Sequence, residues 1–239
     1  MALLAARWQL AAVHAFTSVG STLDTAHALA PASASGTLVL ADEQTAGRGR
    51  HGRRWASAAG AGIWLTLIER PNDARALDVL ALRCGLYAAE ALDALAGAAV
   101  RVKWPNDLYV GDRKLAGTLI ETRWRGTAPE WVAIGFGLNV VAPDADDAIG
   151  LSPGAERLAA LDRIVPALRR AAAATRHLSA DEVARWRERD LSVGRLVIEP
   201  ADGVVQGISA SGELLLAAEG RTCAFRSGSL TFATPLPCS

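Results

Sequence analysis

Two strand patterns, residues 37–43 and 63–68, flank a segment of glycine and arginine, and this order limits the folds open to the chain. In residues 44–55, Gln-Thr-Ala-Gly-Arg-Gly-Arg-His-Gly-Arg-Arg-Trp, three glycines lie among four arginines. Clustered glycines indicate positive φ angles or a close approach of the backbone to a ligand. Arginine brings a permanent charge and a planar fork that suits carboxylates and phosphates. The segment therefore predicts a flexible loop that closes over an anion.

The spacing of these glycines also matches GxGxxG, the dinucleotide-binding pattern, over residues 47–52. In a Rossmann fold, that loop opens a helix within a βαβ unit. Here Arg53-Arg-Trp-Ala-Ser and a second strand follow instead, and no Gly-Lys-Ser/Thr of a P-loop follows either. Glu69 lies about where a ribose-binding acid is expected, and we interpret this as coincidence. The order of elements thus argues against both nucleotide-binding folds.

Strand patterns follow one another with few helices between them up to residue 190. We predict strands at 37–43, 63–68, 100–103, 108–110, 113–121 and 131–140, and helices at 22–30, 76–95, 156–175 and 179–189. This succession is typical of an α+β fold, with a mixed or antiparallel sheet backed by helices. Ser21 or Thr22 is expected to cap the first helix. Ser179 with Glu182 three residues later predicts a capping box on the last one.

Other signals mark breaks in this pattern. Gly97 is expected to end the long helix before it, and Pro166 to kink or divide the helix that contains it. Pro71-Asn72 is expected to end the second strand. Residues 1–20 are interpreted as a short leader, too short for a separate DNA-binding domain.

The texture of the sequence changes near residue 191. Four short strands are predicted at 195–199, 204–209, 213–217 and 222–227, separated by turns at 201–203, 211–212 and 219–220. This pattern is typical of a small β-barrel of about SH3 size. We therefore predict two domains, residues 1–190 and residues 191–239.

The composition limits the class of protein. The chain has 239 residues, half of them hydrophobic, and 25 Lys+Arg balance 25 Asp+Glu to zero formal net charge. A general nucleic-acid-binding protein is usually basic overall. Cys84, Cys223 and Cys238 form no CxxC pair, so they suit neither a disulfide framework nor a zinc site. Without a recognisable signal peptide or an apolar run of membrane-spanning length, we expect a soluble, cytoplasmic protein.

A second motif, residues 103–117, supplies a candidate partner for the glycine and arginine loop. Lys114 is followed by Leu-Ala-Gly, and the small residues Ala116 and Gly117 indicate that something lies close against this strand. A lone lysine on a strand is otherwise a solvated edge charge. Asn106-Asp107, after a proline, is by itself more often a turn former than a ligand contact.

Four motifs appear in order: 44–55, 103–107, Lys114-Leu-Ala-Gly117 and Gly135-x-Gly-x-Asn139. In this combination the chain closely resembles the biotin protein ligases (biotin–[acetyl-CoA-carboxylase] ligases) over about residues 19–232. The resemblance implies a class II synthetase-like catalytic domain with an SH3-like C-terminal barrel. It also implies that biotin and ATP form biotinyl-5′-AMP and pyrophosphate. Biotin then passes to one lysine of a biotin carboxyl carrier domain.

The resemblance also assigns roles to individual residues. The catalytic positions are Lys114, Arg48 and Arg50. The biotin-binding positions are Ser21, Thr22, Gln44, Arg48, Gly49, Arg50, Lys114 and Gly117. The adenylate-binding positions are Arg50, Trp55, Asn106, Asp107, Lys114 and Asn139. Lys114 is expected between the biotin carboxylate and the α-phosphate. Leu23 departs from the family, which usually has asparagine there.

The implied ligands are biotin and ATP as substrates with Mg²⁺, whose protein ligands the sequence does not identify. The implied partner is the carrier domain of acetyl-CoA carboxylase, with no DNA or membrane, and a homodimer through the central sheet is possible. The acceptor lysine is the nucleophile, so the chain needs none of its own. This agrees with the scatter of its histidines, His14, His27, His51 and His177.

Three alternatives remain open at this point. A lipoate ligase or acyltransferase shares the central lysine, and titration with biotin and with lipoate separates the two. A nucleic-acid-binding module using the arginine loop predicts steeply salt-dependent binding and no ATP turnover. A degenerate biotin-binding protein is the third, for which Leu23 is the one indication.

Overall fold

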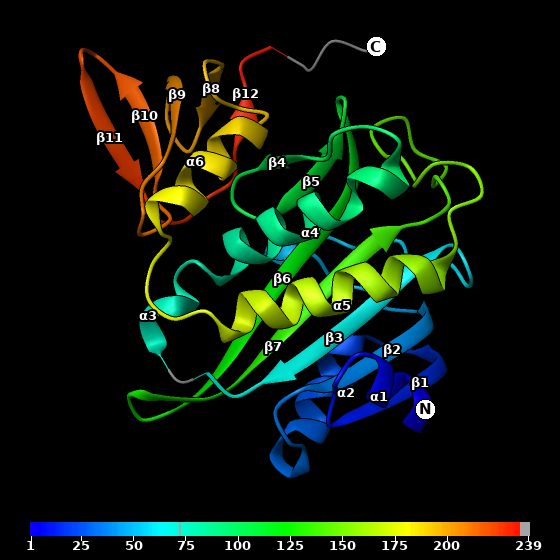
Figure 1. The fold of residues 1–239 in the computed structure, drawn as a ribbon. Helices are drawn as coiled ribbons and strands as arrows, with labels where there is room; N and C mark the ends of the chain where they lie inside the picture. Colours follow the sequence, from blue (N-terminus) through cyan, green and yellow to red (C-terminus); the bar gives the residue numbers. More distant parts are fainter. Residues whose placement is uncertain (72, 235–239) are drawn as a thin grey trace.

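The computed structural model describes residues 1–71 and 73–234, and its main layer is a seven-stranded sheet (Figure 1). The strand order is β1-β2-β3-β7-β6-β5-β4. The strands are β1 (Ala12–Val19), β2 (Thr37–Gln44), β3 (Gly62–Glu69), β4 (Arg101–Lys103), β5 (Asp107–Val110), β6 (Arg113–Arg125) and β7 (Ala128–Asn139). Strands β1 and β2 are parallel, and every other neighbouring pair is antiparallel. The expected α+β fold with a mixed sheet is confirmed.

Helices cover both faces of this sheet. In Figure 1, α4 (Leu80–Ala96) and α5 (Arg157–Ala173) lie side by side across one face, and α2 (Thr22–Leu29) packs on β2, β3 and β7. Neighbouring residues of β2 separate the faces. Leu38 belongs to the large core with α4 and α5, and Val39 to the small core with α2. No helix in the described part of the chain is long and apolar enough to span a membrane.

The interpretation of residues 1–20 as a leader is wrong. They form α1 (Ala2–Arg7) and β1, and β1 pairs in parallel with β2 so that Val13 lies opposite Leu38. Trp8 is buried, and its Nε1 donates to Asp162 Oδ1 on α5 at 2.8 Å. The segment is therefore part of the main core. Strand β1 is an edge strand with a single buried residue, Val13, so it lacks the alternation that marks a strand in the sequence.

Most other element predictions hold, with changes at the breaks. The expected helix 76–95 is divided into α3 (Ala74–Leu77) and α4, and Gly97 ends α4 in the left-handed region at φ 67°. Helix α5 runs through Pro166 as one element. The capping box of Ser179 and Glu182 is present on α6 (Ala180–Arg189). Strand β3 ends at Glu69, and Asn72, predicted to end it, lies outside the described residues. Two short 3₁₀ turns, η1 (Ala30–Ala32) and η2 (Arg50–Gly52), complete the helical segments.

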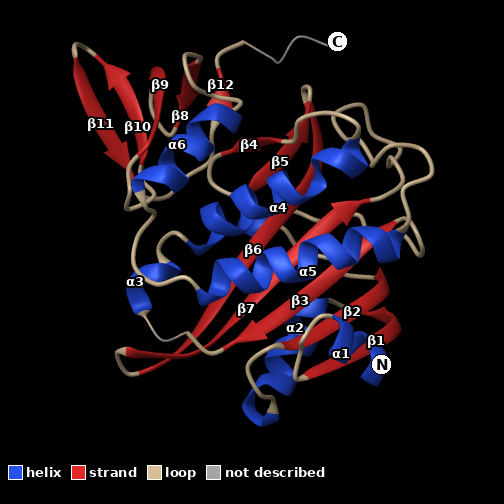
Figure 2. Cartoon of the chain, viewed as in Figure 1, coloured by secondary structure: helices blue, strands red, loops and turns tan. Residues whose placement is uncertain are grey.

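The C-terminal part forms a second, antiparallel sheet of five strands (Figure 2). Its order is β11-β10-β9-β8-β12, with β8 (Leu196–Glu199), β9 (Gly203–Ile208), β10 (Leu214–Ala218), β11 (Arg221–Phe225) and β12 (Thr231–Phe232). Four of these strands match the prediction, and the two-residue β12 was not predicted. Cys238 lies outside the described residues, and the domain boundary at residue 191 stays a prediction.

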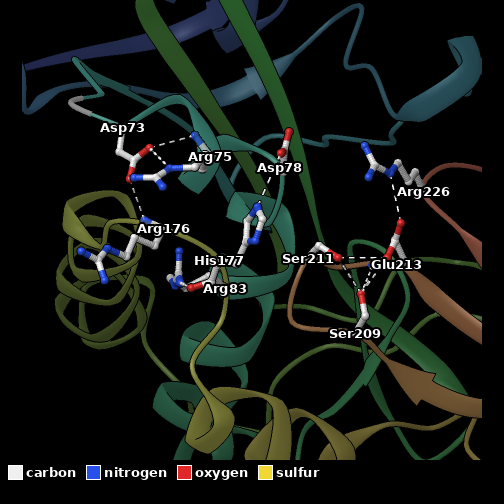
Figure 3. A network of polar contacts seen from close by, with 10 residues as sticks. All are labelled: Asp73, Arg75, Asp78, Arg83, Arg176, His177, Ser209, Ser211, Glu213 and Arg226. Carbon is white, nitrogen blue, oxygen red and sulfur yellow. Dashed lines mark hydrogen bonds and ion pairs between the residues drawn. The ribbon is translucent and has the colours of Figure 1, made fainter.

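The chain after α6 is joined to the first sheet by hydrogen bonds at β4 and at the residue that follows it. Trp104 Nε1 donates to the carbonyl of Gly212 at 3.1 Å, and the amide of Leu191 donates to the carbonyl of Val102 at 2.9 Å. The turn that carries Gly212 is itself held by Glu213. Its Oε2 accepts from Ser211 Oγ at 2.9 Å (Figure 3).

An ion pair is buried within the helix layer. Arg83 on α4 donates from Nε to Glu182 Oε1 on α6 at 2.6 Å, and Tyr87 donates to the same oxygen at 2.8 Å. Arg83 also donates to the carbonyl of His177 (Figure 3). Burial alone raises the pKa of Glu182, but hydrogen bonds from Arg83, the Ser179 amide and Tyr87 lower it to about 2. The pair therefore joins α6 to the core as a buried, charged unit in which Arg83 Nε and Nη2 have acceptors, while Arg83 Nη1 has none among the described residues.

Candidate active site

A cavity of about 440 Å³ opens on the face of the sheet opposite α4 and α5. Its position follows from the pleat of β7. Phe136 and Leu138 enter the core beneath the helices, so Gly135 and Gly137 face the other way and line the cavity. The cavity brings together all twelve residues that the resemblance assigns to the site: Ser21, Thr22, Gln44, Arg48, Gly49, Arg50, Trp55, Asn106, Asp107, Lys114, Gly117 and Asn139.

Glycines form the floor of the cavity because an indole ring lies directly on it. A Cβ atom at Gly137 would lie 2.8 Å from Trp55 Nε1, and one at Gly117 would lie 3.2 Å from Trp55 Cζ3. The first distance is too short for any side chain, so β7 needs glycine at position 137 for the ring to rest on it, and the second leaves little room on β6. Trp55 Nε1 is buried without a hydrogen-bond partner among the described residues. The Trp55 ring thus gives the cavity a flat apolar surface, and its Nε1 is a hydrogen-bond donor without an acceptor among the described residues.

Polar groups meet at the end of the cavity where α2 begins. Gln44 Oε1 accepts from the amide of Thr22 at 2.8 Å and from its Oγ1 at 3.1 Å, while Gln44 Nε2 donates to Ser57 Oγ at 2.9 Å. Ser21 is the N-cap residue of α2, as expected, although its side chain makes no capping hydrogen bond. Leu23 is buried against Gly135 and adds an apolar wall.

Lys114 stands over the floor at the other end of the cavity. Its Nζ lies 2.8 Å from Asp107 Oδ1 and 5.0 Å from the centre of the Trp55 ring. The side chains of Lys114 and Asp107 keep 29% and 23% of their accessible surface, so a ligand can reach both. Asp107 and the Trp55 ring therefore hold the Lys114 ammonium group above the floor of the cavity.

Two asparagines fasten the walls. Asn106 Nδ2 donates to the carbonyl of Thr118 at 2.7 Å. Asn139 Nδ2 donates to the carbonyl of Ile149 at 3.2 Å, which ties the loop after β7 to the sheet. Residues of that loop, including Asp147, line the cavity. The sequence predicted only a surface loop at 141–153.

The glycine and arginine loop closes one side of the cavity. Arg50 Nη1 donates to Asn106 Oδ1 at 3.2 Å, and its Nη2 donates to the carbonyl of Gly228 at 2.8 Å, so Arg50 joins the loop to both sheets. Burial lowers the pKa of Arg50, although Asp107 opposes the shift. Arg48 reaches outward to Asp24 on α2 at 2.7 Å.

The cavity also contains residues whose roles the sequence did not reveal. Lys103 Nζ lies 5.0 Å from the Phe232 ring and 5.7 Å from the Tyr109 ring. Burial lowers the pKa of Lys103, Asp107 opposes this, and the nearby charge of Lys114 adds to it. Phe232 comes from the second sheet, so no local pattern around Lys103 could have indicated this contact.

The charges of the cavity are strongly one-sided. Six basic side chains line it, namely Arg48, Arg50, Arg53, Arg54, Lys103 and Lys114, against two carboxylates, Asp107 and Asp147. The chain as a whole has no formal net charge. Among the described residues, no three His, Cys, Asp or Glu side chains come together as a metal site. The cavity is thus built to hold a ligand with several negative charges next to a flat group.

Comparison with known proteins agrees with this geometry. The Biotin/lipoate A/B protein ligase family matches residues 13–139, and the chain belongs to this family. It is 34% identical to the biotin–[acetyl-CoA-carboxylase] ligase of Mycobacterium tuberculosis, over 85% of this chain and 81% of that protein. The enzyme of the same name from Paracoccus denitrificans is also 34% identical, over 79% and 87%. The chain spans only 63% of the length of the Escherichia coli bifunctional ligase/repressor BirA, which is 34% identical over 78% of this chain.

Solved structures show the same fold. The Aquifex aeolicus biotin protein ligase in complex with biotin and ATP superposes with a TM-score of 0.74 at 25% identity, covering 94% of this chain and all of that one. The Leishmania major enzyme in complex with biotinyl-5-AMP gives 0.62, also at 25% identity, covering 90% and 98%. The similarity includes the second sheet, because it extends over nearly the whole of both chains.

Proposed function

We propose that this protein is an ATP-dependent biotin protein ligase that forms biotinyl-5′-AMP and then transfers biotin to a lysine of a carrier domain. The observation that carries the proposal is the place of Lys114, which stands over a glycine floor in a cavity lined by six cations. A carboxylate and a triphosphate must meet for biotin activation, and their repulsion is severe unless cations lie between them.

In the first step, a carboxylate oxygen of biotin attacks the α-phosphorus of ATP. The bond from that phosphorus to the bridging oxygen breaks, and pyrophosphate leaves. Lys114 would contact both the carboxylate and an α-phosphate oxygen, where it would stabilise the charge that develops in the transition state. Arg48, Arg50 and the amides near Gly49 hold the same groups from the loop.

The remaining residues of the cavity would hold the polar head of biotin and the adenylate. Ser21, Thr22 and Gln44 offer hydroxyls and an amide to the polar head of biotin. Trp55, Asn106, Asp107 and Asn139 surround the adenylate. Mg²⁺ would arrive with the phosphates of ATP and neutralise the leaving pyrophosphate.

In the second step, the amine of the carrier lysine attacks the biotinyl carbonyl and forms an amide. The bond from the carbonyl carbon to the phosphate oxygen breaks, AMP leaves with its electron pair, and the amine loses a proton. The chain supplies no nucleophile to this step. The partner we propose is the biotin carboxyl carrier domain of acetyl-CoA carboxylase, and the proposed compartment is the cytoplasm. A homodimer would form through the edge of the central sheet, where β1 is the terminal strand.

Exchange of radioactive pyrophosphate into ATP tests the activation step. We expect exchange that depends on biotin and on this protein with MgATP, and much weaker exchange with lipoate in its place. Exchange that occurs with lipoate but not with biotin would identify a lipoate ligase. No exchange with either acid, together with salt-dependent binding of DNA or RNA, would favour the nucleic-acid-binding alternative.

A further inference from the structure

Arg48 is held by carboxylates from two different elements. Its Nη2 lies 2.7 Å from Asp24 Oδ1 on α2 and 3.6 Å from Glu121 Oε1 on β6. Both elements also line the cavity, through Thr22 and Gly117. Arg48 therefore links the loop to two walls at once. Among the described residues these contacts use only Nη2, and a guanidinium group has five N–H donors. The remaining donors are left for a ligand.

Glu121 is itself oriented by a second pair of side chains. Its Oε2 lies 2.9 Å from His27 Nε2, and Trp131 Nε1 lies 3.0 Å from His27 Nδ1. An indole N–H can only donate, so His27 Nδ1 accepts in this contact. In the neutral ring the proton is then on Nε2, where it points to Glu121. Trp131 on β7 thus fixes the tautomer of His27, and His27 fixes the carboxylate that Arg48 contacts.

We propose that Asp24 and Glu121, the latter oriented by His27 and Trp131, are positioning residues that set where Arg48 lies at the mouth of the cavity. The proposal rests on the proposed function, because it assigns Arg48 to the acid and phosphate of the activation step. Side chains this exposed form weak pairs one at a time. Together, Asp24 and the His27-oriented Glu121 give Arg48 a defined position. Because each contact is weak, the glycine and arginine loop can still open.

A competing role for the two carboxylates predicts the opposite change in the rate of adenylate formation. If Asp24 and Glu121 competed with the ligand for Arg48, their removal would free the arginine and speed adenylate formation. If they position it, their removal slows the reaction, because Arg48 must then be ordered by the ligand alone. The direction of the change therefore separates the two.

A double-mutant cycle tests the route through Arg48. We expect Glu121→Gln to slow biotinyl-5′-AMP formation, measured in a single turnover, by about fivefold in the parent and less than about twofold in an Arg48→Ala background. His27→Leu should act in the same direction and add little to Glu121→Gln. Glu130→Gln removes a carboxylate that pairs with Arg125 on an exposed hairpin, and it should leave the rate unchanged. An equal loss in both backgrounds, no loss, or a faster reaction would overturn the proposal.

A second readout does not need turnover. Trypsin cleaves after arginine, and without substrates we expect the Asp24→Asn, Glu121→Gln double variant to be cleaved after Arg48 about five times faster than the parent. Glu130→Gln should match the parent. Faster cleavage of the double variant, with a parent that forms no adenylate, would refute the proposed function and leave the positioning of Arg48 standing. Unchanged cleavage would refute the positioning.

Discussion

An ion pair lies on each face of the central sheet, and the two pairs differ in how far they are exposed to solvent. In the helix layer, the side chains of Arg83 and Glu182 keep only 1% and 9% of their accessible surface. In the cavity, Lys114 and Asp107 keep 29% and 23%. The first pair is sealed from water and the second is open to ligands. A buried ion pair is stable only when every partner is present, whereas a half-exposed pair can exchange a partner for a substrate.

The difference extends to the number of contacts. Glu182 accepts from Arg83, from Tyr87 and from the Ser179 amide. Asp107 is the one carboxylate that pairs with Lys114 among the described residues. The helix-layer pair is thus closed to ligands, whereas the cavity pair is exposed enough for a ligand to reach it.

The largest expected effect is on folding. Glu182→Gln leaves the Arg83 charge buried without its partner and should lower the free energy of unfolding by about 3–5 kcal/mol. Urea denaturation measures the loss. The folded fraction should keep the activity of the parent per molecule, because the pair lies on the face opposite the cavity. A loss below about 1 kcal/mol would contradict the structural role.

The same pair predicts how stability depends on pH. The pKa of Glu182 is lowered to about 2 from its ordinary value of 4.5. Its ionised form therefore stabilises the fold fully above pH 4.5, and this contribution is lost as the pH falls from there towards about 2. The stability difference between the parent and Glu182→Gln should shrink across that window. A constant difference would show that the charge of Glu182 is not responsible.

In the cavity, Lys114→Ala should affect chemistry and leave the fold intact. Lys114 contributes little packing, so the melting temperature should change little. Adenylate formation should slow by about 10²-fold or more, the scale for losing a group that stabilises developing charge. Pyrophosphate release at nearly the parent rate would refute the role of Lys114.

Arg50→Gly should have an intermediate effect. It removes the hydrogen bonds that tie the loop to Asn106 and to the carbonyl of Gly228. We expect biotinyl-5′-AMP to leave the cavity at least about tenfold faster, as the loss of one charged hydrogen bond implies. Filter binding of labelled adenylate measures its release. An unchanged half-life of the complex would exclude a retaining role for Arg50.

The smallest effect is expected at the surface. Asp162 on α5 pairs with Arg7, whose side chain is half exposed, and accepts from Trp8 Nε1. Asp162→Asn should cost about 1 kcal/mol or less in unfolding free energy. It is the matched control for Glu182→Gln, because both changes replace a carboxylate by an amide in the helix layer. Equal losses would remove the distinction between buried and exposed pairs.

The sequence predicted the elements whose signals are local. The capping box of Ser179 and Glu182 and the helix end at Gly97 both appear in the structure. The fold class was also predictable, because strands followed one another after the arginine loop where a Rossmann fold has a helix. The twelve residues that the resemblance assigned to the site line one cavity, and their roles stay predictions.

What the sequence could not predict depends on distant contacts. Strand β1 is defined by parallel pairing with β2, about 25 residues later, and its exposed edge position hides the strand pattern. The break between α3 and α4 has no glycine or proline to mark it. The pairing of Arg48 with Asp24 and Glu121 joins three elements, so no spacing within one element could indicate it.

Intact-mass spectrometry of a biotin carrier domain tests the central claim most directly. The domain is incubated with this protein, biotin and MgATP, beside the same mixture with Lys114→Ala. We predict that the parent adds one biotinyl group to a single lysine and that the variant adds it far more slowly. An acceptor of unchanged mass after prolonged incubation with the parent, or equal labelling by the variant, would contradict the account.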